Sequence, residues 1–462
     1  MPNSQKSVYR YDISQLFKLM LPILITQVCQ AGLALVDTIM AGRVSATDLA
    51  GVAVGAGLWM PLFLFATGIL IATTPLLGEA IGENKPEQIP HITQQSLWLA
   101  LFIGVIGMGL VNVMPLLFSY LGVPTTIVPI AKEYLFGIAF GFPAITLYAT
   151  LRGYAESLKK PIIVTLISIL GVLLVIPANY AFIYGLNWQG QTLIPRFGGA
   201  GCGYATALVL WLNLALLASY LIFSKNKTFL AHRFHRHFAK PDINMIKKIT
   251  QVGLPIGVAV FFEVSLFSLA SLVISPLGEI AVASHQVAMS VTSQLFMIPL
   301  SVAMALTIMV SNCYGAKDWH GLRRMQWLGL GLSTLIAAVC TGLMALFRDK
   351  LPTLFTDNPA VIAQALHLLF FAMVYQLFDA WQVTIAGILR GIQDTTAVMW
   401  ITLFCYWVVA LPLGVYLVRF TDMGNKGFWV ALVTGLGIAS VLLGLRLWQQ
   451  QNVLKERWEN LG

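Results

Sequence analysis

Charged residues are scarce in this chain. Only 10% of its 462 residues are Asp, Glu, Lys or Arg, whereas 58% are hydrophobic and the mean hydropathy is +0.80. Soluble domains carry about 25% charged residues, so this composition excludes an ordinary soluble protein. We predict an integral membrane protein.

Cysteines and catalytic motifs are also lacking. The five cysteines are odd in number, widely spaced and placed within or at the ends of apolar segments. This placement is typical of packing residues and excludes a disulfide framework or a cysteine metal site. No H-E-x-x-H, G-x-S-x-G or phosphate-loop pattern occurs, so the sequence does not favour a membrane-embedded enzyme. We expect neither enzymatic activity nor a cofactor.

Long apolar runs, by contrast, recur along the whole chain. A helix needs about 20 apolar residues to cross a hydrocarbon core of about 30 Å. Backbone groups in lipid must be hydrogen-bonded within the segment, so runs of this length predict helices and not barrel strands. Twelve runs qualify, at residues 15–41, 50–78, 92–120, 133–153, 161–185, 199–223, 248–275, 281–312, 325–347, 361–389, 396–419 and 427–446.

Basic residues are unevenly distributed over the connections between these runs. If the N-terminus is cytoplasmic, 21 of the 28 Lys and Arg residues lie on the cytoplasmic side. The positive-inside rule therefore places both termini in the cytoplasm. The net charge of +9 then reflects topology and contact with anionic membrane lipid, and it does not indicate a nucleic-acid partner.

The two halves of the chain are related in sequence. A shift of 233 residues places LPIGVAVFFEVS from Leu254 on LPILITQVCQAG from Leu21. A shift of 238 residues places LRGIQDT from Leu389 on LRGYAES from Leu151. Related halves with a substrate site near the membrane midplane are typical of transporters that work by alternating access.

The predicted fold class is therefore an all-α integral membrane protein with twelve transmembrane helices in two pseudo-symmetric six-helix bundles. We place the N-terminal bundle at residues 1–223, a basic cytoplasmic linker at 224–247 and the C-terminal bundle at 248–462. Because the two fused bundles already supply an interface for a transport pathway, we expect a monomer.

Three acids lie inside apolar stretches that otherwise carry no charge: Asp37 in residues 19–42, Glu263 in 249–278 and Asp379 in 358–389. At 1.5 Å per helical residue, Glu263 lies roughly 22 Å above the basic anchor Lys248. Asp379 lies roughly 17 Å above Arg390 on the same arithmetic, so both acids lie near the middle of the membrane. An ionised carboxylate at this depth costs at least about 3 kcal/mol. The acids therefore indicate proton or cation binding; the alternative is a structural acid hydrogen-bonded between helices.

Helical spacing groups further polar residues with these acids. Two stripes each share one helix face: Tyr375, Asp379 and Gln382 on one span, and Thr26, Gln30 and Asp37 on another. The repeat also places Gln30 on Glu263, so both bundles present a polar group at the same position. We expect these stripes to face an internal cavity.

Several segments resemble the NorM-type branch of the multidrug and toxic compound extrusion (MATE) family, over essentially the whole chain: LPILITQVCQAGLALVDTIMAG, FFEVSLFSLASLVISPLGEIAVASHQVA, GGAGCGYATA and the paired LRG segments. The resemblance implies a bacterial inner-membrane antiporter that exports amphipathic, often cationic drugs and dyes in exchange for Na⁺ or H⁺. Its expected partners are these small molecules and membrane lipid.

The resemblance also implies roles for individual residues. Glu263 and Asp379 match the acids of the second bundle's cation site, where Na⁺ is the only metal expected. The supporting polar residues are Tyr375, Gln286 and Gln382 in the second bundle, and Asn179, Thr206 and Gln30 with Asp37 in the first. Val175 stands where NorM-like sequences commonly have Asn, which argues against a first-bundle metal site that depends on that amide.

One alternative shares the two-bundle plan. A lipid-linked oligosaccharide flippase is expected to carry cationic residues inside its spans to bind a pyrophosphate, whereas this chain carries acids there. The sequence therefore favours drug efflux over lipid flipping, and it leaves the choice between H⁺ and Na⁺ open.

Overall fold

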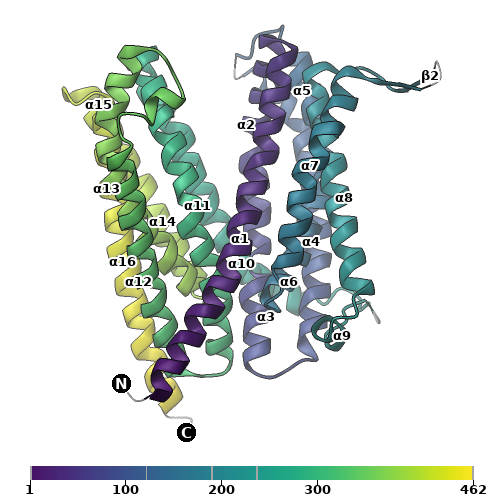
Figure 1. Cartoon of the computed structure of the whole chain (residues 1–462), viewed down its shortest axis with the longest axis vertical. Helices are drawn as coiled ribbons and strands as arrows, with labels where there is room; N and C mark the ends of the chain where they lie inside the picture. Colours follow the sequence, from purple (N-terminus) through teal and green to yellow (C-terminus); the bar gives the residue numbers. More distant parts are fainter. Residues whose placement is uncertain (1–2, 121, 189–190, 236–237, 460–462) are drawn as a thin grey trace. The chain divides into compact units, whose positions relative to one another are not determined.

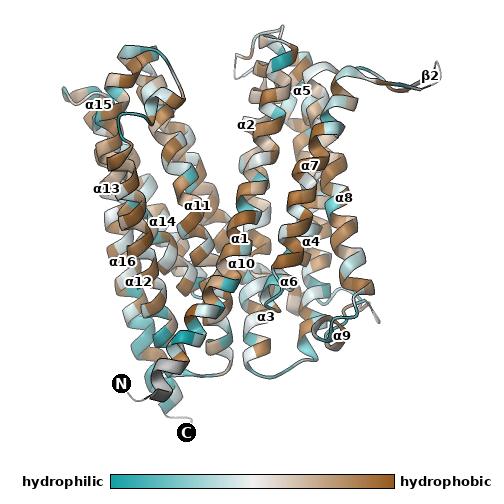
Figure 2. Cartoon of the chain, viewed as in Figure 1, coloured by the Kyte–Doolittle hydropathy of each residue, from teal (hydrophilic) through white to brown (hydrophobic). Residues whose placement is uncertain are grey.

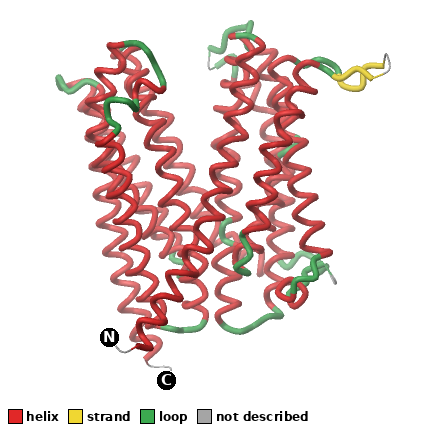
Figure 3. The backbone as a smooth tube through the Cα atoms, viewed as in Figure 1, coloured by secondary structure: helices red, strands yellow, loops and turns green. Residues whose placement is uncertain are grey.

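The computed structural model describes residues 3–120, 122–188, 191–235 and 238–459. Nearly all of these residues are helical (Figures 1 and 3), and a short antiparallel hairpin of β1 (Leu186–Trp188) and β2 (Gln191–Ile194) follows α7. The helices are α1 (Asn3–Val44), α2 (Ala46–Leu70), α3 (Thr73–Gly82), α4 (Gln88–Val113), α5 (Val128–Ala139), α6 (Phe142–Ser157), α7 (Ile162–Tyr184), α8 (Gly201–Phe223), α9 (Lys227–Ala231), α10 (Ile243–Ile274), α11 (Glu279–Gly315), α12 (Trp319–Leu346), α13 (Pro359–Gly391), α14 (Thr395–Leu403), α15 (Leu411–Phe420) and α16 (Asn425–Glu459), with a π-helical turn at Phe404–Ala410.

The long helices are apolar along most of their length (Figure 2). Eleven helical stretches of the described chain are long and apolar enough to cross a membrane. The pair α5 and α6, bent by 44°, forms a twelfth when counted as one span. Pro143 in the first turn of α6 lacks a backbone donor, which accounts for the break. Each predicted run coincides with one of these spans, and the predicted fold class is confirmed.

The helices pack into two compact units, one of residues 25–257 and one of residues 1–24 together with 258–462. The boundaries fall inside α1 and α10, so each of these helices contributes its first part to one unit and its remainder to the other. Pro22 and Pro255, which the 233-residue shift pairs, each lie two residues before a boundary. The predicted boundaries of the two bundles and the linker describe the repeats along the sequence and not these compact units. They stay a prediction.

In the unit of residues 25–257, α8 packs closely on α5 and α7. Gly203 permits this approach, because a Cβ atom there would lie 2.4 Å from the backbone oxygen of Tyr134. The core around this contact holds Tyr134 and Trp59, both buried. Close packing of α5, α7 and α8 brings their polar side chains into one interior.

In the other unit, α13 is the central helix and packs against α11, α12 and α16. Gly387 permits a close approach to α11, because a Cβ atom there would lie 2.7 Å from the backbone oxygen of Ala303. The acid-bearing helix is therefore surrounded by others on most sides.

The structure corrects one of the two repeat alignments. Lys159 and Gln393 both have positive φ, at 59° and 63°, and follow the ends of α6 and α13. Their N–H groups donate to the carbonyls of Glu156 and Arg390. The two helix ends therefore correspond with a shift of 234 residues, and the 238-residue match of the LRG segments is wrong. The two shifts differ by four residues, which is about one helical turn. The incorrect alignment therefore still placed residues of the same helix face on one another.

The 233-residue shift, by contrast, agrees with the structure. Asn84 and Lys317 both have positive φ, at 56° and 54°, and end the helical hairpins of the two halves in the same way. Their N–H groups donate to the carbonyls of Ile81 and Tyr314, which the same shift pairs.

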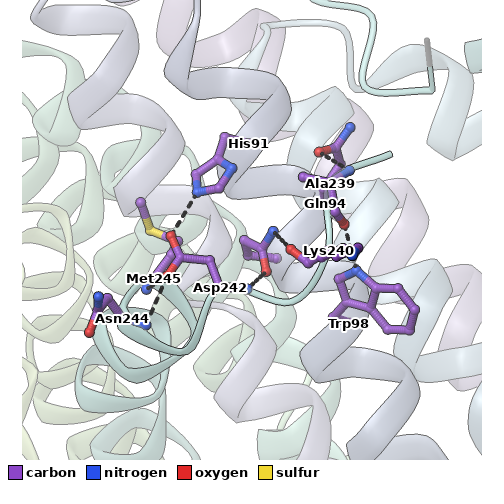
Figure 4. A network of polar contacts seen from close by, with 9 residues as sticks. His91, Gln94, Trp98, Ala239, Lys240, Asp242, Asn244 and Met245 are labelled. Atoms are coloured by element: carbon purple, nitrogen blue, oxygen red, sulfur yellow. Dashed lines mark hydrogen bonds and ion pairs between the residues drawn. The ribbon is translucent and has the colours of Figure 1, made fainter. Parts of the chain in front are cut away.

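Side chains of α4 hold the connection that leads into α10 (Figure 4). Gln95 donates from Nε2 to the carbonyl of Lys240 at 3.1 Å and accepts the N–H of Asp242 at Oε1 at 2.7 Å. His91 Nε2 lies 3.2 Å from Asp242 Oδ2. This part of the predicted linker is thus fixed to the unit of residues 25–257, whereas residues 236–237 lie outside the described residues.

Candidate functional site

The structure brings three predicted residues together around Asp37, and we call Asp37, Asn179 and Thr206 the Asp37 cluster. Asn179 on α7 donates from Nδ2 to Asp37 Oδ1 at 2.7 Å. Thr206 on α8 donates from Oγ1 to Asp37 Oδ2 at 2.6 Å. All three side chains are buried. Each carboxylate oxygen of Asp37 therefore has a protein donor, which suits a charged group in an apolar interior.

Two aromatic residues complete this environment. Trp59 on α2 donates from Nε1 to the hydroxyl of Tyr134 at 3.2 Å, and the Tyr134 hydroxyl lies near enough to Asp37 to interact with it electrostatically. Sequence reasoning missed both residues, because neither belongs to a spacing pattern of polar side chains. Val175 is fully buried on α7, so its position adds an apolar surface and no amide.

The second cluster has the opposite character. Asp379 on α13 is 1% exposed, yet neither of its carboxylate oxygens accepts a hydrogen bond from any described residue. Glu263 on α10 is half-buried and interacts electrostatically with Asp379 and with the hydroxyl of Tyr375. We call Glu263, Asp379 and Tyr375 the Glu263–Asp379 site.

Further buried polar atoms without partners surround this site. They are both amide atoms of Gln376, Oε1 of Gln382 and the hydroxyl of Tyr406. An unsatisfied buried polar group costs about 1–3 kcal/mol, and native structures contain few of them. These atoms and the two acids form a polar interior within an otherwise apolar unit.

Tyr375, Asp379 and Gln382 of the predicted stripe are all buried on α13, and the internal cavity that the stripe is expected to face stays a prediction. Gln376 was missed, although its place three residues before Asp379 fits the same face. Tyr406 belongs to the π-helical turn after α14. Such turns occur frequently at functional sites, but no feature of the sequence predicted this one.

Two of the predicted site residues lie outside both clusters. Gln286 is exposed on α11 and Gln30 is half-buried on α1. No side-chain hydrogen bond joins either of them to an acid within the described part of the chain. Thr26, on the same stripe as Gln30, is buried and shares a hydrogen bond of 3.1 Å with the hydroxyl of Thr165.

One basic residue departs from its expected role as a distant anchor. Arg390 is half-buried near the end of α13 and interacts electrostatically with Glu263. Its side chain bends back along α13, because Nε donates to the carbonyl of Ala386 at 3.2 Å. Helix arithmetic on Cα positions does not include the length and direction of the Arg side chain, which is why the sequence did not predict this interaction.

Buried acids on membrane-spanning helices are typical of proteins that move ions and solutes, so the fold and the site define a membrane transporter. The family model MatE matches residues 22–181 and 255–416. The chain belongs to this family.

Individual relatives agree with this assignment. The chain is 51% identical over 449 residues to a protein of Acinetobacter baylyi named "Probable multidrug resistance protein NorM", covering 97% of this chain and 98% of the relative. It is 39% identical to the "Multidrug resistance protein NorM" of Vibrio vulnificus, covering 95% and 96%. A crystal structure of a MATE protein in a bent conformation matches with a TM-score of 0.87 at 22% identity, covering 97% of each chain, and this likeness concerns the fold.

Proposed function

We propose that this protein is a multidrug efflux antiporter that exports amphipathic, mainly cationic drugs and dyes in exchange for H⁺ or Na⁺ by alternating access. The relatives at 51% and 39% identity are named multidrug resistance proteins. The single observation that supports ion coupling is Asp379, a buried carboxylate without a protein donor.

Asp379 suits a coupling role because its ionised form lacks stabilisation from the protein. A proton or a small cation supplies the interaction that no described side chain provides. The carboxylate of Glu263 interacts electrostatically with Asp379, which supports one cation site that both acids form. A drug and a coupling ion exchange only if each weakens the binding of the other, and linkage makes this effect reciprocal.

The charge of the site favours cationic substrates. Glu263 and Asp379 contribute two negative charges when ionised, and Arg390 contributes one positive charge. The net charge stays negative, and Coulomb attraction is stronger in a low dielectric than in water. Cationic amphipathic guests are therefore preferred over anionic ones of the same shape.

The Asp37 cluster has a different proposed role. Both oxygens of Asp37 already accept hydrogen bonds from Asn179 and Thr206, so an arriving cation gains less there than at Asp379. Asp37 therefore acts in substrate release or in a second protonation, after the first ion-binding step.

The proposed location is the bacterial inner membrane, where the protein acts as a monomer with both termini in the cytoplasm. The charge distribution supports this orientation, with 21 of 28 basic residues on one side of the predicted topology. Exposed apolar side chains on the spans, such as Phe102 and Leu272, suit contact with lipid.

The test is ethidium efflux from everted membrane vesicles, driven separately by a pH gradient and by a Na⁺ gradient. Wild type should respond to at least one gradient. Asp379→Asn and Glu263→Gln should each abolish gradient-driven transport, because each change keeps the shape and removes the ionisable group. Asp357→Asn, which alters an exposed acid outside the spans, is the matched control and should transport normally.

Normal gradient-driven efflux by either Asp379→Asn or Glu263→Gln contradicts the assigned role. Movement of a labelled lipid-linked oligosaccharide by wild type, without any ethidium efflux, supports the flippase alternative instead.

A further inference from the structure

The structural alignment of the two repeats exposes a difference in buried charge. With the 234-residue shift, Glu156 at the end of α6 corresponds to Arg390 at the end of α13, and Arg152 corresponds to Ala386. The first repeat therefore holds an acid and a base one turn apart, whereas the second holds one base.

In the first repeat the two charges neutralise each other. Arg152 donates from Nε to Glu156 Oε1 at 2.7 Å, and their side chains are only 10% and 3% exposed. Arg152 also donates from Nη2 to Gln27 Oε1 at 3.3 Å. The positive charge of Arg152 is therefore balanced by the negative charge of Glu156 on the same helix.

In the second repeat the corresponding partners are missing. Position 386 is an alanine, and the 233-residue shift places the apolar Val260 where the first repeat has Gln27. The acid nearest along the chain, Asp394, is held by Arg446 through two hydrogen bonds of 2.6 and 3.2 Å. No described carboxylate lies within ion-pair distance of Arg390.

The side chain of Arg390 is directed toward the Glu263–Asp379 site. Its Nε bonds to the carbonyl of Ala386, one turn nearer to Asp379. Seven residues separate Ala386 from Asp379, which corresponds to about 10 Å along the helix. The guanidinium interacts electrostatically with Glu263, which stands one turn along α10 from Val260.

We propose that Arg390 is a tethered counter-cation of the Glu263–Asp379 site, and that its permanent charge weakens the binding of the coupling ion so that the ion is released in each transport cycle. This inference rests on the proposed function. Arg keeps its proton under all conditions met by proteins, so its charge acts equally in every state of the two acids. It repels an arriving proton or Na⁺ and stabilises the acids after the ion has left. Arg390 is thus a positioning residue, because its charge acts on the bound ion through Glu263.

The size of the effect follows from Coulomb's law. One unit charge at about 10 Å in a medium of effective dielectric about 20 changes a binding equilibrium by roughly tenfold. Removal of the charge should therefore tighten coupling-ion binding by about this factor. For proton coupling this is a displacement of the pH profile of about one unit toward alkaline pH.

The test measures ethidium efflux from proteoliposomes against the concentration of the coupling ion, in wild type, Arg390→Gln and Arg390→Lys. For Arg390→Gln we expect a half-saturating ion concentration about tenfold lower and a reduced maximal rate, because the ion leaves more slowly. Arg390→Lys keeps the charge and should retain the wild-type ion dependence. A purely structural role lowers the maximal rate without tightening ion binding, and that result overturns the proposal.

The first repeat supplies a matched control. Arg152→Gln combined with Glu156→Gln removes a buried pair at the corresponding helix end with no change in net charge, and it should leave the ion dependence unchanged. A shift in this control as large as that of Arg390→Gln also overturns the proposal.

Folding is tested in the same series. If Arg390→Gln does not accumulate, the double variant Arg390→Gln with Glu263→Gln should accumulate, since it removes the acid together with its counter-cation. Failure of the double variant as well assigns Arg390 to packing and refutes the proposal. Failure of the proposed function is distinguishable, because it appears as wild-type efflux that ignores both ions.

Discussion

The two buried aspartates predict opposite effects of the same substitution on stability. Asp37 has a donor on each oxygen, Asn179 at 2.7 Å and Thr206 at 2.6 Å, whereas Asp379 has none among the described residues. Changing each aspartate to asparagine keeps the side-chain volume and removes the charge. We expect Asp37→Asn to destabilise the protein and Asp379→Asn to stabilise it.

The magnitudes follow from the hydrogen bonds. A hydrogen bond to a charged group contributes about 1.5–3 kcal/mol. An asparagine at position 37 keeps one carbonyl acceptor and turns an amide toward the other donor, so the net cost is about 2 kcal/mol. At position 379 the substitution replaces an unsatisfied carboxylate with a neutral amide, and because burying a neutral group without partners costs less than burying a charged one, we expect a gain of about 1–3 kcal/mol.

The assay is thermal unfolding of the purified protein in detergent, at pH 8 without Na⁺, where no coupling ion is supplied in excess. In a chain this long, about 2 kcal/mol shifts the midpoint by only a few degrees, so the variants are compared side by side at one heating rate. Asp357→Asn, at an exposed position, should unfold at the wild-type temperature. Lower pH or added Na⁺ should stabilise wild type and reduce the advantage of Asp379→Asn, because the ion then supplies what the amide supplies.

Two results refute this reasoning. If Asp379→Asn lowers the midpoint as much as Asp37→Asn does, then Asp379 is held by interactions that its geometry does not show. If the midpoint of Asp379→Asn rises but the gain is independent of both pH and Na⁺, then the stabilisation has no connection with a coupling ion.

Two further predictions concern individual hydrogen bonds. Thr206→Val should lower the unfolding midpoint, with a loss of about 1.5–3 kcal/mol, whereas Thr206→Ser, which keeps the hydroxyl donor to Asp37, should unfold close to wild type; equal midpoints for the two variants contradict the assignment. At the connection into α10, the hydrogen bond with His91 and the N–H groups of Asn244 and Met245 hold the pKa of Asp242 below its ordinary value. A lowered carboxyl pKa stabilises the folded state above the ordinary pKa, and this contribution is lost as the pH falls through the lowered value. Hydrogen exchange of residues 238–245, corrected for its intrinsic pH dependence, should therefore stay slow at neutral pH and accelerate in acid, whereas Asp242→Asn should exchange faster at neutral pH and lose the acid transition.

The spans and the acid Asp37 were accessible to sequence reasoning because each leaves a compositional trace, whereas Asn179 and Thr206 were expected only from the resemblance to the family. Apolar runs identify helices through the need to satisfy the backbone in lipid, and acids inside those runs stand out. The contacts of Arg390 and Tyr406 were not accessible, because they depend on side-chain direction and on a π-helical turn. The LRG segments show that matching identical residues alone can give a wrong alignment. A displacement of one helical turn keeps the residues on the same helix face, so the sequence does not reveal the error.

The two bundles handle buried charge in different ways, and this difference bears on where ion coupling takes place. In the first, Asp37 has two donors and the charge of Arg152 is matched by Glu156. A cation that binds there has to compete with bonds already formed, so the gain is small. In the second, Asp379 has no donor and Arg390 has no carboxylate within ion-pair distance among the described residues. Glu263 interacts electrostatically both with the opposite charge of Arg390 and with the like charge of Asp379, so we expect the arrival or departure of one ion to change the electrostatic energy of the whole site. We therefore expect the coupling ion to bind first in the second bundle, and the Asp37 cluster, where protonation has to break an existing hydrogen bond, to respond in a later step.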